Sequence, residues 1–139
     1  MRFLMVLFAM IFLHCFADYT LQGCLADLKQ KRWWIKETHG IPKYANDYKM
    51  ALAVHSFEWS FMIMLPALIF MFVTQTTFSW HGLIETLVYM LMLAANTLFH
   101  YTIDDMKAND RTINLVQDQL WHLGQIGLTW IFWTVFFGW

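Results

Sequence analysis

The chain has 139 residues, of which 59% are hydrophobic, 19% aromatic and only 14% charged, and its mean hydropathy is +0.44. This composition excludes an ordinary soluble domain and favours membrane-spanning helices, each of which needs about 20 mostly apolar residues. The formal net charge of −1 says little about partners. No nucleic-acid partner is expected, because the basic residues gather in one short stretch between apolar segments.

The first apolar segment predicts a helix over residues 3–23. It is entirely apolar up to Leu13 and then carries His14, Asp18 and Gln22. Because these three positions advance by four residues each time, they lie along one stripe of a helix. A histidine and a carboxylate one helical turn apart recur further along the chain, and this repetition is the most informative feature of the sequence.

Residues 25–49 predict a polar and basic loop. They contain six of the nine lysines and arginines, together with tryptophans and tyrosines that suit the headgroup level of a membrane. The run His39-Gly40-Ile41-Pro42 would interrupt any helix there. The simpler interpretation is a cytoplasmic loop with interfacial anchors, and the alternative is a patch that binds anionic lipid headgroups.

Two further apolar segments predict helices over residues 50–73 and 80–103. The first of them has His55 near its start, and the second ends at His100 and Asp104, again four residues apart. A polar loop follows over residues 105–114. The last predicted helix covers residues 115–139, and its first turns carry a third such pair, Asp118 and His122.

These elements predict an all-α membrane protein, a single domain over residues 1–139 that forms a bundle of four transmembrane helices. Four crossings place the loops 25–49 and 105–114 on one side of the membrane, with eight of the nine basic residues. The other side has only Arg2. The excess of positive charge on cytoplasmic loops then predicts that both termini lie outside a bacterial-type inner membrane.

This topology brings the ionisable residues of all four helices to the same depth, in the inner leaflet. An ionised side chain inside a bilayer costs about 2.5–3.5 kcal/mol on insertion scales, so such groups must face one another, water or a cation. Imidazole and carboxylate groups from facing helices are typical ligands of divalent metals in bundle cores. The predicted metal ligands are His14, Asp18, His55, His100, Asp104, Asp118 and His122.

Seven ligands exceed the four of a tetrahedral zinc site, so the sequence predicts either two metals or one metal with some of these residues orienting the ligands. Zn, Mn and Fe all suit this donor set. Gln22, Gln119 and Asn96 are expected to orient ligands. The alternative is that each pair is a local ion pair at the headgroup level. His81 and Glu85 have the same spacing at the outer end of a helix and are expected to be interfacial.

The motifs resemble a family of bacterial and phage membrane proteins known as domain of unknown function 3307. Members open with H-x3-D-[FY]-x-L-Q, have a histidine early in the second helix, then H-x3-D, and close with D-Q-x2-H. The corresponding residues here are His14-x3-Asp18-Tyr19-x-Leu21-Gln22, His55, His100-x3-Asp104 and Asp118-Gln119-x2-His122. The resemblance spans nearly the whole chain and implies a membrane bundle with a metal centre. It supplies no established activity, although a weaker likeness links the pattern to small membrane proteins described as metal-dependent hydrolases.

The residues and the resemblance favour a metal-dependent hydrolase that acts on a phosphoester or lipid headgroup at the cytoplasmic face. The metal would activate a water molecule and polarise the substrate. A carboxylate off the metal, Glu58 or Asp105, would act as general base. Two other classes stay open. One is a non-catalytic protein that binds or conducts a metal ion or protons, and the other is a small phage-type membrane protein that works through contact with its own copies or another membrane protein.

Overall fold

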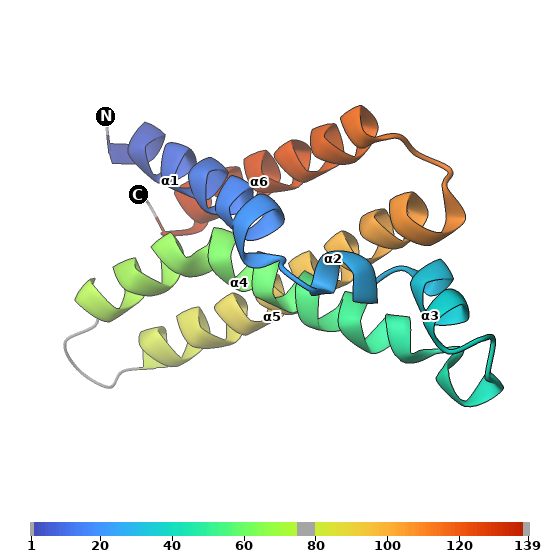
Figure 1. The fold of residues 1–139 in the computed structure, drawn as a ribbon. Helices are drawn as coiled ribbons and strands as arrows, with labels where there is room; N and C mark the ends of the chain where they lie inside the picture. The colour runs from blue at the N-terminus through green and yellow to red at the C-terminus, as the bar shows by residue number, and fades with distance from the viewer. Residues whose placement is uncertain (1, 75–79, 138–139) are drawn as a thin grey trace.

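The computed structural model of the chain describes residues 2–74 and 80–137, and within these ranges all regular secondary structure is helical (Figure 1). The all-α prediction is therefore confirmed. The predicted single domain stays a prediction. The last two residues of the helix predicted over residues 115–139 lie outside the described ranges.

Four long helices form the body of the molecule. They are α1 (Arg2–Phe16), α4 (Asp47–Thr74), α5 (Trp80–Asp105) and α6 (Leu115–Phe137). Two of them continue into short π-helices, α1 into η1 (Ala17–Leu21) and α5 into η3 (Met106–Asp110). Each predicted helix is recovered to within a few residues of its predicted bounds.

The basic segment between α1 and α4 is more regular than a loop. It contains two short helices, α2 (Leu25–Leu28) and α3 (Lys31–Glu37), and the 3-10 helix η2 (Pro42–Tyr44). The predicted interruption lies between α3 and η2, where His39 and Gly40 both have positive φ, +51° and +74°. This left-handed backbone ends the helix.

Three helical stretches among the described residues are long and apolar enough to cross a membrane, by length and composition. They are Phe3–Leu21, Pro42–Val73 and Trp80–Asp110. The fourth long helix, α6, is not among them, so the prediction of four spans is confirmed only in part. The reason lies in the first half of α6, where Asp118, Gln119, His122 and Gln125 lower the average hydropathy.

The long helices pack in pairs, α4 along α5 and α1 against both α4 and α6 (Figure 1). The start of α1 and the end of α6 lie at one end of the bundle. The basic segment with α2 and α3 lies at the other end, as does the connection from α5 to α6 (Figure 1). We call this second end the loop end.

The apolar core fills the bundle away from the loop end. Its fully buried side chains are Trp59, Ile63, Met64, Ile126 and Trp133. The outward faces of the long helices are also apolar, with large residues such as Phe8, Phe12, Leu91 and Val135 exposed. A surface of this kind is typical of helices that contact lipid.

Candidate metal centre

The seven predicted ligands are all buried at the loop end, with exposed fractions between 0% and 7%. They come from four segments: α1 with η1, α4, α5 and α6. Buried polar and charged groups are tolerated only when they satisfy one another or bind an ion. The predicted meeting of the polar stripes is therefore what the structure shows, and the geometry of their atoms decides what the cluster can do.

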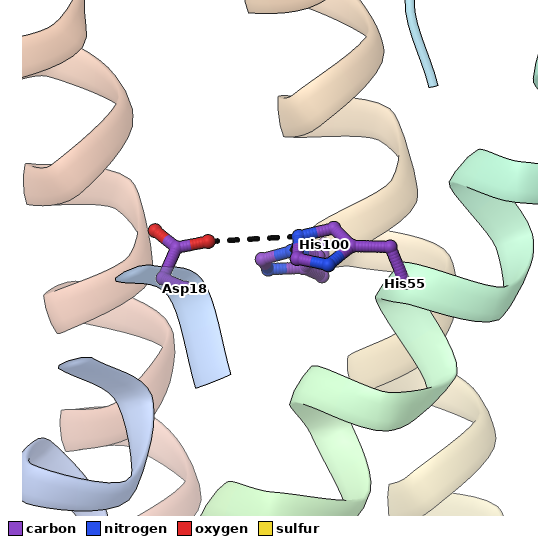
Figure 2. A group of neighbouring side chains, drawn as sticks. All are labelled: Asp18, His55 and His100. Atoms are coloured by element: carbon purple, nitrogen blue, oxygen red, sulfur yellow. Dashed lines mark hydrogen bonds and ion pairs between the residues drawn. The ribbon is translucent and has the colours of Figure 1, made fainter. Parts of the chain in front are cut away.

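One group of atoms surrounds the imidazole of His55, which projects from α4. Its Nε2 lies 3.5 Å from Asp18 Oδ1, 3.4 Å from His100 Nε2 and 3.3 Å from Asp104 Oδ2. Figure 2 shows Asp18, His55 and His100 pointing toward one another from three different elements. These side chains offer one carboxylate and two imidazole nitrogens to a common point.

A second group surrounds His122 on α6. Its Nε2 lies 3.3 Å from Asp118 Oδ1 and 3.4 Å from Asp104 Oδ1, and His100 Nε2 lies 3.7 Å from the same Asp104 oxygen. Asp104 thus faces His55 with Oδ2 and His122 with Oδ1. A carboxylate that presents its two oxygens to two ligand groups is suited to bridge two metal ions.

The separations between the histidine nitrogens and the aspartate oxygens are compatible with a metal site. Protein N–H···O hydrogen bonds are about 2.7–3.2 Å long. In tetrahedral coordination with bonds of about 2.0–2.1 Å, neighbouring ligand atoms lie about 3.3–3.4 Å apart. Asp104 Oδ1, Asp118 Oδ1 and His122 Nε2 are buried without a hydrogen bond to any described residue. Buried polar atoms without hydrogen bonds are costly, and a shared cation would satisfy all three.

Six of the seven predicted ligands take part in three overlapping groups that can hold a metal ion. In each group the ligand atoms lie within 4.8 Å of one another. The groups are Asp18 with His55 and His100, His100 with Asp104 and His122, and Asp18 with Asp118 and His122.

His14 is the exception. Its Nδ1 accepts a hydrogen bond of 2.8 Å from the indole of Trp59, and its Nε2 donates to Gln119 Oε1 at 3.1 Å. Both ring nitrogens are used, so in this arrangement His14 supports the cluster from beside it, 5.7 Å from the ring of His122. Trp59 also stacks on His100, with 4.1 Å between ring centroids. The sequence did not predict these contacts of Trp59 with His14 and His100, although Trp59 lies one helical turn after His55.

Gln119 orients two carboxylates, as predicted. Its amide donates hydrogen bonds of 3.0 Å to Asp18 Oδ2 and to Asp118 Oδ2. Gln22 lies close by, and its amide donates to the backbone oxygen of Asp18. Asn96 does not reach the cluster. It forms a separate polar contact between α5 and α6, where it accepts hydrogen bonds from Gln125 and Thr129.

Two lysines complete the cluster, and the sequence predicted neither of them as part of it. Lys29 Nζ lies 2.5 Å from Asp104 Oδ2, and Lys107 Nζ lies 2.6 Å from Asp118 Oδ2. Lys107 follows Asp104 by three residues, a spacing that indicates proximity on a helix. No local spacing links Lys29 to a carboxylate 75 positions away. With neutral histidines, the three aspartates and two lysines leave one excess negative charge.

The two predicted general bases lie outside these groups. The Asp105 carboxylate accepts a hydrogen bond of 2.6 Å from Asn109, one turn along η3. Glu58 is half-buried on α4 and belongs to none of the three groups. His81 and Glu85, the pair with the same spacing at the other end of α5, lie apart from the cluster. The side chain of His81 is 82% exposed and lies 3.0 Å from Glu85.

The cluster borders a cavity at the loop end, with a volume of about 420 Å³. Asp104 is part of the cavity wall, as are Lys29 and Lys107. A molecule in this cavity would therefore reach a carboxylate of the cluster without passing through the apolar core.

Comparison of the chain with protein-family models, with curated proteins and with solved structures finds no match. The resemblance to domain of unknown function 3307 stays a prediction.

Proposed function

We propose that this protein is a membrane-embedded, metal-dependent hydrolase of phosphoesters. One observation carries the proposal: three aspartates and three histidines from different helices are buried together, with oxygen and nitrogen atoms 3.3–3.7 Å apart. The bordering cavity supports an enzyme rather than a closed structural site, because a hydrolase needs access for water and substrate.

The proposal includes α6 as a fourth membrane helix. Its polar residues Asp118, His122, Gln125 and Thr129 are all buried against the other helices. Its outward face is apolar, with Leu128 and Val135 71% and 78% exposed. A helix that turns polar residues inward and apolar residues outward is suited to lipid, although its average hydropathy is reduced.

We also propose the sidedness predicted from the sequence. The loop end contains eight of the nine basic residues and would face the cytoplasm, with both termini outside a bacterial-type inner membrane. The candidate metal centre would then lie in the inner leaflet, where it could act on a lipid headgroup or on a phosphoester from the cytoplasm.

The two carboxylate oxygens of Asp104 could bind one or two divalent ions, with Zn, Mn and Fe as candidates. Asp18, His55 and His100 would hold one, and Asp118 and His122 the other, with Asp104 between them. Such ions polarise a phosphoryl oxygen and make a water molecule easier to deprotonate.

In the proposed reaction, a water oxygen bonds to phosphorus and the ester P–O bond breaks. One water proton is transferred to the departing alkoxide, which leaves as the alcohol. The other is transferred to a carboxylate of the cluster. In a site with one metal, Asp18 or Asp118, whichever is not a ligand, would accept this proton, because Glu58 and Asp105 lie outside the three ligand groups.

A specific observation favours a second candidate, a non-catalytic metal- or proton-binding protein. Lys29 and Lys107 already neutralise two of the three carboxylates through ion pairs. A network of this kind can satisfy buried charges without any metal.

Elemental analysis of the detergent-purified protein separates the two candidates. The wild type is expected to contain close to one or two equivalents of Zn, Mn or Fe, and His100→Ala and Asp118→Asn to lose most of it. His81→Ala is the matched control, because it removes an exposed histidine with the same spacing to an acidic residue. Metal-loaded wild type should then release phosphate or alcohol from a phosphoester. A folded wild type that takes up no metal after reconstitution would exclude the hydrolase.

A further inference from the structure

The cavity beside Asp104 has an unusual concentration of positive charge. Its wall is formed by residues from η1 to α3 on one side and from α5 to the connection before α6 on the other. Four of its ten lining residues are basic, and Asp104 is the one acidic residue among them. The basic lining residues are Lys29, Arg32, Lys107 and Arg111.

These four cations divide into two kinds. Lys29 and Lys107 lie at the bottom of the cavity, because their ammonium groups contact Asp104 and Asp118. Arg32 and Arg111 are exposed near the surface. Arg32 uses its Nε to donate a hydrogen bond of 2.6 Å to Gln30, which leaves the terminal nitrogens of the guanidinium available. The planar fork of a guanidinium matches the oxygens of a phosphate group.

The walls of the cavity are held together by Asn109, in η3. Its side chain accepts a hydrogen bond of 2.7 Å from the backbone N–H of Lys31 and donates one of 3.2 Å to the carbonyl of Lys29. It also donates to Asp105, the carboxylate expected at first to act as a base. Two basic segments far apart in the sequence are therefore fixed around one space.

We propose that this cavity is the subsite for the phosphate group of an anionic substrate. The inference rests on the proposed function, since it places the phosphate beside the candidate metal ligands. Arg32 and Arg111 would hold the phosphate oxygens, and Lys29 and Lys107 would contact both the anion and the cluster. A volume of about 420 Å³ accommodates a headgroup or a small soluble phosphoester but not acyl chains, which would stay among the lipids.

The test measures binding of inorganic phosphate to the detergent-purified protein by equilibrium dialysis, with metal content measured on the same samples. Arg32→Gln and Arg111→Gln are each expected to weaken phosphate binding about tenfold or more, since each removes a charge-assisted contact. Metal content should stay at the wild-type level. Lys36→Gln is the matched control, because Lys36 is an exposed cation of α3 outside the cavity.

The outcomes separate this inference from the proposed function. Absence of saturable phosphate binding in the wild type, or an equal loss in Lys36→Gln, would overturn the subsite. A wild type without metal that still binds phosphate, sensitive to both arginine variants, would keep the subsite and remove the hydrolase.

Two competitors identify the source of the phosphate group. Glycerol 3-phosphate represents a soluble phosphoester, and vesicles of phosphatidylcholine with phosphatidic acid represent a lipid headgroup, with pure phosphatidylcholine vesicles as the reference. Displacement of phosphate by either competitor supports the subsite and names its source. Displacement by neither would overturn it.

Discussion

The loop end of the bundle and the other half, which we call the core half, are formed by the same four long helices. Their interiors are stabilised by different interactions. The core half is filled by side chains such as Ile63, Met64 and Ile126, which are stabilised by packing. The loop end is filled by aspartates, histidines and lysines, which are tolerated only while each charge has a partner. A substitution in the core half removes packing contacts alone. A substitution at the loop end also leaves the charged partners of the lost residue unpaired.

The largest expected effect comes from removing Asp104, the residue that joins both ligand groups. Asp104→Ala leaves the buried ammonium of Lys29 without its partner, and we expect a loss of about 3–5 kcal/mol in the free energy of unfolding. Metal should be lost as well. Unfolding in detergent and elemental analysis measure the two effects.

The double variant Lys29→Met with Asp104→Leu is the companion experiment. It replaces the ion pair with apolar groups of similar size, so it should recover most of the stability without recovering the metal. A double variant that binds metal like the wild type would show that Asp104 is not a ligand.

In the core half we expect a large loss of stability without a loss of metal. Ile63→Ala creates a cavity in a fully buried site and should destabilise the protein by about 2–5 kcal/mol. Metal per folded protein should not change, because Ile63 lies outside the cluster. Loss of metal in this variant at temperatures where it is folded would contradict the separation of the two halves.

A smaller effect is expected at the boundary between the halves. Trp59→Phe removes the hydrogen bond to His14 Nδ1 and keeps an aromatic ring beside His100. We expect a loss of about 1 kcal/mol and retention of the metal. Thermal unfolding compared with wild type checks the first part, and a metal titration the second. Abolished metal binding would show that the contacts of Trp59 with His14 and His100 are needed to position the metal ligands.

The smallest effect is expected at His81. His81→Ala removes an ion pair between an 82% exposed histidine and Glu85, and ion pairs at the surface contribute about 0–1 kcal/mol. Its unfolding midpoint and metal content should both match the wild type within error. A clear loss of metal would show that the content measured in the cluster variants reflects a general effect of histidine removal.

Much of the fold followed from helical periodicity and from the need to gather polar groups in an apolar chain. Three separate stripes, which contain Asp18, Asp104 and Asp118, were expected to meet, and these three residues are buried close together. Spacing did not decide burial, however. His81 and Glu85 share the spacing of the buried pairs, yet the side chain of His81 is 82% exposed.

The rest depends on helix rotation and on contacts distant in sequence, which spacing does not encode. The approach of Lys29 to Asp104 spans 75 positions, and that of His14 to Gln119 spans 105. These contacts decide which nitrogens remain available to a metal. His14 was expected as a ligand, but both of its ring nitrogens form hydrogen bonds, and it therefore lies in a supporting position. Asp105 was expected as a base because it is a carboxylate off the metal, but it accepts a hydrogen bond from Asn109.

X-ray absorption at the metal edge, on detergent-purified protein loaded with zinc, tests the central claim most directly. The account predicts nitrogen and oxygen ligands at about 2.0–2.1 Å with outer-shell scattering from imidazole rings, and a weaker imidazole signal in His100→Ala. The same spectrum in His81→Ala should match the wild type. Ligation without imidazole, or a spectrum unchanged by His100→Ala, would show that the metal binds elsewhere and that the cluster is an ion-pair network.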